Sequence, residues 1–232
     1  MDGKFLKINM GKSNSYLIKG KEGYLLIDAG VEGQVDKLKT KMDKHEIKFK
    51  DIILIVITHV HYDHVGSLKE IKEKTKAPVL VHEAEADLLK KSVSHFPAGN
   101  NWIGKIISNI ASSYLDDKNS FEPVKPDIVM KEYYNLEGFG FEGEIIHTPG
   151  HSAGSITVFI ENRHCFTGDT MFSFMPFTVN PPFADDSEKL YKSWEKIATY
   201  DCWFFYPGHG YRFSRNKFMS SLKRKRKKHK NS

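Results

Sequence analysis

The sequence predicts an α/β fold in which two β-sheets face each other and helices cover their outer sides, a four-layer sandwich. Three observations support this prediction. In the first half of the chain, β-rich runs alternate with helical patterns, which is typical of parallel strands joined by crossover helices. The run "DIILIVI" at residues 51–57 is almost entirely apolar, as in a strand covered on both faces. The second half of the chain has a similar layout.

The first half begins with a predicted hairpin. Residues 15–30, "SYLIKGKEGYLLIDAG", hold two β-rich runs around a Gly-Lys-Glu-Gly turn, and Gly30 breaks the second run after Asp28. Hydrophobic periodicity then predicts the elements that follow. They are a helix at 31–44, a strand at 51–57, a helix at 66–76, a strand at 78–82 and a short helix at 83–92.

The segment 93–127 is less regular than its neighbours. Its apolar residues from Trp102 to Tyr114 fall at helical spacing and form one apolar face. We favour a helix packed on the body of the protein. The alternative is an inserted lid or rim over a functional site, or a dimer face.

The second half contains strands joined by turns within residues 142–170, and they end in Asp169 followed by a loop, as the first hairpin ends in Asp28. A helix is predicted at 187–199 and a strand at 202–206. The "PGHG" that follows puts His209 in a place comparable to that of His59.

Composition favours one soluble cytoplasmic domain, residues 1–222, with a basic and disordered tail at 223–232. The stretch "KRKRKKHK" accounts for the formal charge of +6, because the rest of the chain carries about −1. A contact of this tail with nucleic acid is the less favoured interpretation. No signal peptide or membrane span is evident, and two distant cysteines, Cys165 and Cys202, argue against a disulfide framework.

Polar side chains that can bind a metal ion follow several of the predicted strands. The carboxyl ends of strands in α/β sheets are where loops converge and ligands bind, and "TPGHSAGS" is a Gly-Pro-rich loop that can turn an imidazole inward. We therefore expect seven candidate ligands to meet at one seam. They are His59, His61, Asp63, His64, His151, Asp169 and His209.

Imidazole nitrogens with a few carboxylate oxygens suit zinc, and also iron or manganese. A catalytic zinc uses three protein ligands and keeps one open position. Seven donors therefore supply two divalent ions if one carboxylate bridges them. Such a pair lowers the pKa of a shared water toward about 7, which yields hydroxide without a protein nucleophile.

The motif "THVHYDH" resembles the H-x-H-x-D-H signature of the metallo-β-lactamase superfamily, and "IDAG", "TPGHSAGS", "FTGDT" and "PGHG" match further motifs of that family in order. The resemblance implies an αββα sandwich with a dinuclear site in which Asp63 and Asp169 are the catalytic residues. Asp28 supports the site without binding metal. The implied ligands are His59, His61 and His151 for the first ion and Asp63, His64 and His209 for the second, with Asp169 bridging.

Departures from the family patterns narrow the expected substrate. Asp169 stands where true β-lactamases carry another residue. An aspartate at this position is similar to the glyoxalase II and lactonase-type members of the family. Glyoxalase II proper has a longer C-terminal helical region, and the nuclease branch has a large insertion between Asp169 and His209, where only about forty residues lie here. We expect a hydroxide-dependent hydrolase of a small ester, thioester or lactone.

Two other functions remain open at this stage. A phosphodiesterase is the second choice, to which the basic tail gives modest support, and an iron-dependent sulfur dioxygenase is the third. The expected partner is a small molecule, with a homodimer as an open question. Weaker site candidates are His82, His147, Tyr62 and the Phe- and Met-rich stretch 171–183, which forms either a pocket wall or ordinary core.

Overall fold

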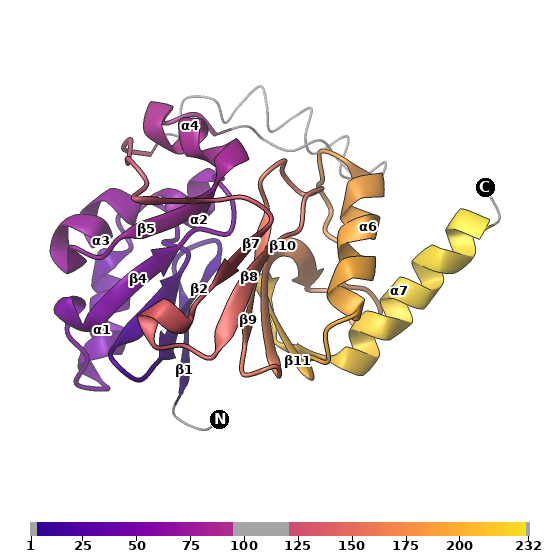
Figure 1. Cartoon of the computed structure of the whole chain (residues 1–232), viewed down its shortest axis with the longest axis horizontal. Coiled ribbons are helices and arrows are strands. Elements are labelled where there is room, and N and C mark those ends of the chain that lie inside the picture. The colour runs from indigo at the N-terminus through magenta and orange to yellow at the C-terminus, as the bar shows by residue number, and fades with distance from the viewer. Residues whose placement is uncertain (1–3, 95–120, 231–232) are drawn as a thin grey trace.

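Two sheets face each other in the computed structural model, which describes residues 4–94 and 121–230. Figure 1 shows helices on the outer side of each sheet, so the layers run helix, sheet, sheet, helix. The predicted four-layer α/β sandwich is confirmed.

The first sheet is built by the N-terminal part of the chain. Its outer strands β1, β2 and β3 pair antiparallel, and β3, β4, β5 and β6 pair parallel, as the alternation of strands and helices predicts. In spatial order the strands are β1 (Phe5–Asn9), β2 (Asn14–Lys19), β3 (Tyr24–Ile27), β4 (Ile52–Val56), β5 (Val79–His82) and β6 (Ile128–Met130).

The second sheet belongs to the C-terminal part. Its strands pair antiparallel except for β10 and β11, which run parallel to each other. In spatial order they are β12 (Phe213–Ser214), β11 (Phe204–Gly210), β10 (His164–Ser173), β9 (Ile156–Ile160), β8 (Gly143–His147) and β7 (Tyr133–Asn135).

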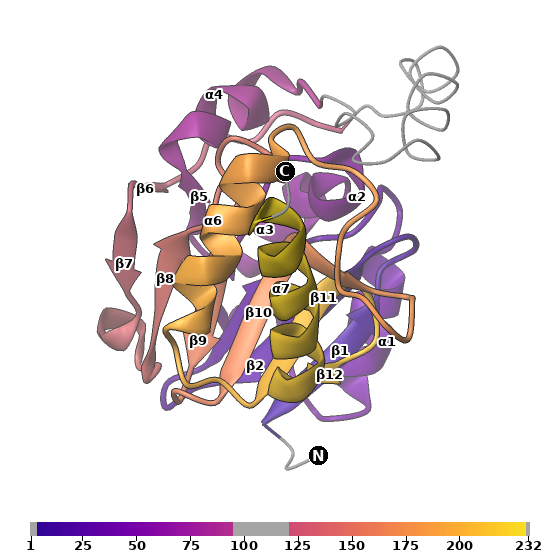
Figure 2. The same ribbon diagram turned by 90° about the vertical axis from the view of Figure 1, so that its right-hand side faces the viewer.

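Helices cover the outer faces of both sheets, and Figure 2 shows α6 and α7 in front of the second sheet. One apolar core lies between the sheets, a second under the helices of the first sheet, and a third under α6 and α7. The described helices are α1 (Val35–Asp43), α2 (Tyr62–Val65), α3 (Leu68–Thr75), α4 (Glu83–Lys91), α6 (Ser187–Ala198) and α7 (Arg215–Lys230), with short 3-10 turns η1 (Phe49–Asp51) and η2 (Glu137–Phe139).

Two strands continue further than the sequence predicts. Asp169 lies inside β10 and His209 lies inside β11, whereas loops were expected there. The parallel pairing of β10 with β11 has register shifts between Phe166 and Phe172. These irregularities keep the two strands paired past residues that resemble a loop, because a bulge absorbs the distorted backbone.

The basic stretch at the C-terminus also differs from the expectation of disorder. Residues 223–230 continue α7, whose Phe218 and Leu222 are buried against the second sheet and α6. Arg226 pairs with Glu195 of α6. The packing of the first turns of α7 holds the helix in place, and the basic residues that follow extend it. Tertiary contacts rather than intrinsic propensity stabilise most helices in proteins.

Most of the segment considered as a lid or rim, residues 95–120, lies outside the described residues. Among the described helices, none has both the length and the apolar character needed to cross a membrane.

Candidate metal centre

The histidine-rich motif begins where β4 ends. Its first part, residues 57–61, is a turn without regular structure, and α2 follows from Tyr62. His59, His61 and His64 are all buried in spite of their polarity. Buried imidazoles need partners, and residues of both sheets supply them.

The first group of donors contains His59, His61, His151 and Asp169, whose ligand atoms all lie within 4.8 Å of one another. His151 Nε2 is 3.1 Å from His61 Nδ1 and 3.5 Å from Asp169 Oδ2. His59 Nε2 is 3.8 Å from the same carboxylate oxygen. His151 enters from the loop between β8 and β9, and Asp169 enters from β10.

The second group contains Asp63, His64 and His209. His209 Nε2 lies 3.2 Å from Asp63 Oδ2 and 3.4 Å from His64 Nε2. Asp169 also reaches this group, because its Oδ1 is 3.3 Å from His64 Nε2 and its Oδ2 is 3.2 Å from His209 Nε2. The Asp169 carboxylate therefore lies between the two groups.

The donor atoms fit metal ions by their spacing and by their chemistry. Ligands at 2.0–2.1 Å around a tetrahedral ion are separated by roughly 3.4 Å. Six pairs of donors within the two groups are 3.1–3.9 Å apart. His59 Nε2 is buried and has no hydrogen-bond partner among the described residues. A divalent cation would satisfy it.

The ring nitrogens that face away from the centre are held by the protein. Asp28 Oδ2 lies 2.8 Å from His64 Nδ1, and Phe183 O lies 3.0 Å from His151 Nδ1. Each Nδ1–H can donate to its oxygen, which leaves Nε2 as a lone-pair donor toward the centre. Such outer partners fix the tautomer and the ring orientation of a metal ligand.

Asp28 follows β3, and of the residues in the two donor groups its carboxylate is hydrogen-bonded to His64. Its Oδ1 accepts hydrogen bonds from the backbone N–H of Thr58 at 2.8 Å and from the Thr58 hydroxyl at 3.0 Å. The residue is buried and has a positive φ of 60°, a conformation that aspartate tolerates better than most residues. Asp28 thus orients His64 and Thr58, and its supporting role at a metal centre stays a prediction.

Electrostatics differ between the two groups in the metal-free protein. Burial and the neighbouring imidazole of His151 lower the pKa of His61 to about 3, and burial and His64 hold the pKa of His59 well below its ordinary value. Burial alone would also lower the pKa of His209, but Asp169 and Asp63 raise it to about 9. Neutral imidazoles in the first group are ready to bind a cation, whereas His209 must first release a proton.

The backbone at Gly208 passes so close to the donors that only glycine fits there. A Cβ on Gly208, next to His209, would lie 2.2 Å from Asp169 Oδ1 and 2.7 Å from His64 Cε1. No other side chain fits there without displacing the donors, which gives "PGHG" a steric reason.

Sequence reasoning missed Glu85, which connects the two loops that carry the first group. This side chain of α4 is buried. Its Oε2 accepts from the backbone N–H of Val60 at 2.9 Å, between His59 and His61. Its Oε1 accepts from the Ser152 hydroxyl at 2.6 Å and the Gly154 N–H at 3.0 Å. An acidic residue four positions before the buried Leu89 was the available signal, since that spacing puts both on one helix face.

The weaker candidates lie outside the two donor groups. His82 caps α4 by accepting from Ala84 N–H at 3.1 Å and stacks on His147, with ring centroids 3.8 Å apart. The Tyr62 hydroxyl lies 2.6 Å from Lys12 Nζ. These contacts give the three residues partners outside the metal centre.

The Phe- and Met-rich stretch lies beside the centre. The Phe172 ring stacks on the His209 ring, with centroids 4.6 Å apart, and the Phe174 ring lies 6.2 Å from it. Phe174, Met175 and Phe177 are 63%, 63% and 79% exposed. Side chains this exposed are not core, so they form an apolar surface next to the donors.

Comparisons with known proteins agree with this geometry. The profile of the metallo-beta-lactamase superfamily matches residues 8–209. The chain is 35% identical over 163 residues to "Probable metallo-hydrolase MJ0888" of Methanocaldococcus jannaschii, which covers 70% of this chain and 68% of that protein. It is 23% identical over 198 residues to human "Acyl-coenzyme A thioesterase MBLAC2", with coverage of 77% and 67%.

A solved structure with the same fold is that of TTHA1623 in a di-iron-bound form. It superposes with a TM-score of 0.68 at 23% identity and covers 93% of this chain and 96% of that one. The family profile spans both sheets and includes all seven candidate ligands. The chain therefore belongs to the metallo-β-lactamase superfamily and is a metallo-hydrolase.

Proposed function

We propose that this protein is a dinuclear metal-dependent hydrolase that acts on a small thioester or carboxylic ester, a lactone being the cyclic form of the latter. The observation that carries the proposal is the position of the Asp169 carboxylate between two groups of donors, beside an exposed apolar surface. The similarity to a protein named as an acyl-coenzyme A thioesterase supports the thioester.

Each half of the donor set would hold one divalent ion. His59, His61 and His151 would bind the first ion, Asp63, His64 and His209 would bind the second, and Asp169 would bridge. Bound ions supply Lewis acidity and lower the pKa of coordinated water toward about 7. Nitrogen and carboxylate donors suit zinc as well as iron, and the di-iron form of TTHA1623 makes iron a specific alternative to zinc.

The protein's own residues fix the donors and keep the bridging carboxylate charged. Asp28 fixes His64 and the Thr58 backbone, so that the motif keeps its shape when substrate enters. The buried Asp169 carboxylate keeps its charge, because His209 and His64 outweigh the effect of burial and hold its pKa well below the usual range. The carboxylate is therefore ionised at neutral pH.

The apolar surface indicates which part of the substrate lies where. Phe172 shields His209 on one side, and Phe174 and Phe177 extend the surface into a cavity of about 730 Å³ that Arg224 also lines. An acyl chain can lie on the rings and be removed from water, which stabilises binding by about 25 cal/mol per Å² of buried apolar area. An arginine nearby suits an anionic carrier group.

The test is turnover by the metal-loaded protein of a panel of acyl thioesters, aryl esters, lactones and phosphodiesters, with metal content measured by elemental analysis. We expect turnover of thioesters or esters and two metal ions per chain. Asp169→Ala should abolish turnover and lower the metal content. Turnover confined to phosphodiesters, or a single ion per chain, would overturn the proposal.

The apolar surface has its own test within that panel. Phe174→Ala should raise KM for a hexanoyl thioester by about tenfold, while the acetyl thioester changes little, because only the longer chain reaches the ring. Tyr133→Ala is the matched control, since Tyr133 is an aromatic residue 53% exposed on β7. Equal effects on both chain lengths would show that Phe174 does not contact the acyl chain.

A further inference from the structure

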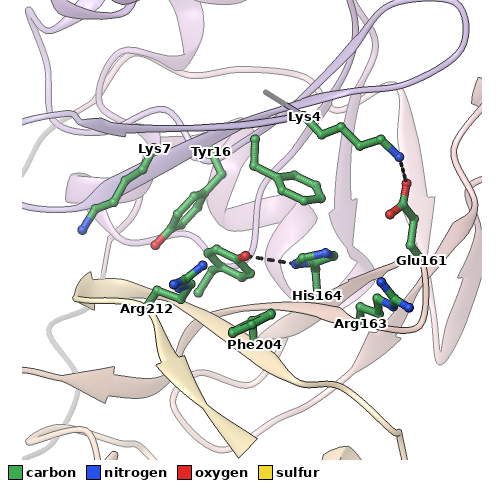
Figure 3. A pocket seen from close by; sticks show the side chains of 10 residues that line it. Lys4, Lys7, Tyr16, Glu161, Arg163, His164, Phe204 and Arg212 are labelled. Atoms are coloured by element: carbon green, nitrogen blue, oxygen red, sulfur yellow. Dashed lines mark hydrogen bonds and ion pairs between the residues drawn. The ribbon is translucent and has the colours of Figure 1, made fainter. Parts of the chain in front are cut away.

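A second cavity, of about 360 Å³, opens between the two sheets away from the metal centre (Figure 3). His164 and Phe204, which line it, begin β10 and β11, and Asp169 and His209 lie five residues further along these two strands. At about 3.3 Å per residue the cavity is roughly 15 Å from the metal centre. Its volume is in the range of sites for small ligands.

Aromatic rings from both sheets line this cavity. Phe5 of β1 approaches His164 of β10 with ring centroids 4.4 Å apart. Tyr16 and Phe204 line it as well. Burial lowers the pKa of His164, so this ring is neutral at pH 7 and its Nδ1 lies 3.0 Å from the Tyr206 hydroxyl. The walls therefore offer flat surfaces on which a planar ring can stack.

Cations surround the aromatic walls. Figure 3 shows Arg212 and Arg163 on either side of Phe204, and Arg212 Cζ lies 4.6 Å from the centroid of the Phe204 ring. Lys7 lines the same cavity and donates one hydrogen bond, 2.6 Å long, to the carbonyl of Gly210. An ammonium group has three donors, so Lys7 can bind a further acceptor.

Negative charge does not balance these cations. Glu161 is the acidic residue of the cavity lining, and its carboxylate pairs with Lys4 at 2.7 Å. Among the described residues, no carboxylate lies within ion-pair distance of Lys7, Arg163 or Arg212. Three cations around a concave aromatic surface attract an anion, and more charge is present than a single carboxylate would balance.

We propose that this cavity binds a small planar aromatic compound that carries a phosphate group. The ring would stack between Phe5 and Phe204, and the phosphate would accept hydrogen bonds from Arg212 beside the Phe204 ring. Arg163 on the other side of Phe204 and Lys7 near the end of β11 would add positive charge without touching the phosphate. Guanidinium groups bind phosphate oxygens in pairs, and a phosphate dianion matches the surplus of positive charge. This site is separate from the metal centre and does not depend on the proposed hydrolase function.

The experiment is isothermal titration of the metal-loaded, full-length chain with adenosine monophosphate, inorganic phosphate and benzoate. We expect saturable binding of the nucleotide, at least about tenfold tighter than binding of either comparison compound, because each of those lacks one half of the recognised chemistry. Equal affinity for inorganic phosphate would show that the ring is not recognised, and equal affinity for benzoate would show that phosphate is not selected. Either result overturns the proposal.

Variants locate the binding. Arg212→Gln, which changes an exposed side chain, should weaken nucleotide binding about tenfold without changing the melting temperature, since a hydrogen bond to a charged group is lost. Arg163→Gln, also at an exposed position, should weaken binding less, because that charge acts without contact. Lys50→Gln removes an exposed charge elsewhere and should have no effect. The metal-centre variant His61→Ala should bind the nucleotide as the wild type does. Loss of binding in that variant, or unchanged binding in both arginine variants, would refute the site.

Discussion

Replacing Glu85 with alanine tests whether one buried carboxylate holds the two loops of the first donor group in place. The change removes the acceptor of three hydrogen bonds, from Val60 N–H, Gly154 N–H and the Ser152 hydroxyl. The hydroxyl keeps a partner in Ser155, 2.8 Å away, so two buried donors lose theirs. Each unsatisfied donor costs about 1–3 kcal/mol, and we expect a loss of about 2–6 kcal/mol in the free energy of unfolding.

Metal affinity should fall as well, because Val60 lies between His59 and His61 while Ser152 and Gly154 follow His151. Removing an outer partner of a metal site typically costs 10–100-fold in affinity. The assays are urea denaturation of the metal-free protein and titration with zinc in competition with a chelator. Glu85→Gln keeps the shape and one acceptor oxygen, so it should lie between wild type and alanine in both assays.

Glu83→Ala is the matched control, since Glu83 lies on the same helix and its half-exposed carboxylate is 3.7 Å from Lys131 Nζ. An exposed pair of this kind contributes about 0–1 kcal/mol. If Glu85→Ala destabilised the protein no more than Glu83→Ala does, the reasoning about buried donors would be wrong. If it destabilised the fold but left zinc affinity unchanged, Glu85 would be a structural residue with no part in placing the ligands.

Three further predictions follow from the same geometry. Gly208→Ala should destabilise the protein by about 1–3 kcal/mol, as overpacking does, and should lower the zinc content measured by elemental analysis. Gly138→Ala should leave the zinc content unchanged, because a Cβ there meets nothing within 4 Å. Urea denaturation across pH should show that the metal-free protein is most stable near pH 6.5. The raised pKa of His209, about 9, gives stability that is lost as pH rises from about 6.5 through 9. The lowered pKa of His61, about 3, makes stability fall as pH drops below about 6.5, because there the unfolded chain binds the proton and the folded chain does not. Zinc loading at pH 7 should release protons into a weakly buffered solution, because His209 must lose its proton to bind a cation, and a titration without proton release would contradict the raised pKa.

Much of the donor set could be predicted because its residues occur in short motifs with fixed spacing. His59, His61, Asp63 and His64 lie within six positions, and their neighbours across the seam were expected from the order of the later motifs. The structure brings all seven side chains into two adjacent groups. Local patterns succeed here because the strand before each motif fixes where the motif lies.

Long-range features could not be obtained in the same way. Glu85 takes its partners from positions 25 and 69 residues away, so the local pattern could at most place its side chain on the buried face of a helix. The strands through Asp169 and His209 were missed because Gly168, Pro207 and Gly208 are typical of loops. Only the parallel pairing of β10 with β11 shows that such residues can be carried within a strand.

The two groups draw their donors from both halves of the chain: His59 and His61 meet His151, and Asp63 and His64 meet His209. Neither sheet alone presents a complete binding set for even one cation. Metal uptake should therefore hold the N-terminal and C-terminal parts of the chain together across the seam between the sheets. Fragments comprising 1–94 and 121–232 would be expected to reassemble more readily with zinc than without it, because an ion that binds donors of both fragments stabilises their complex.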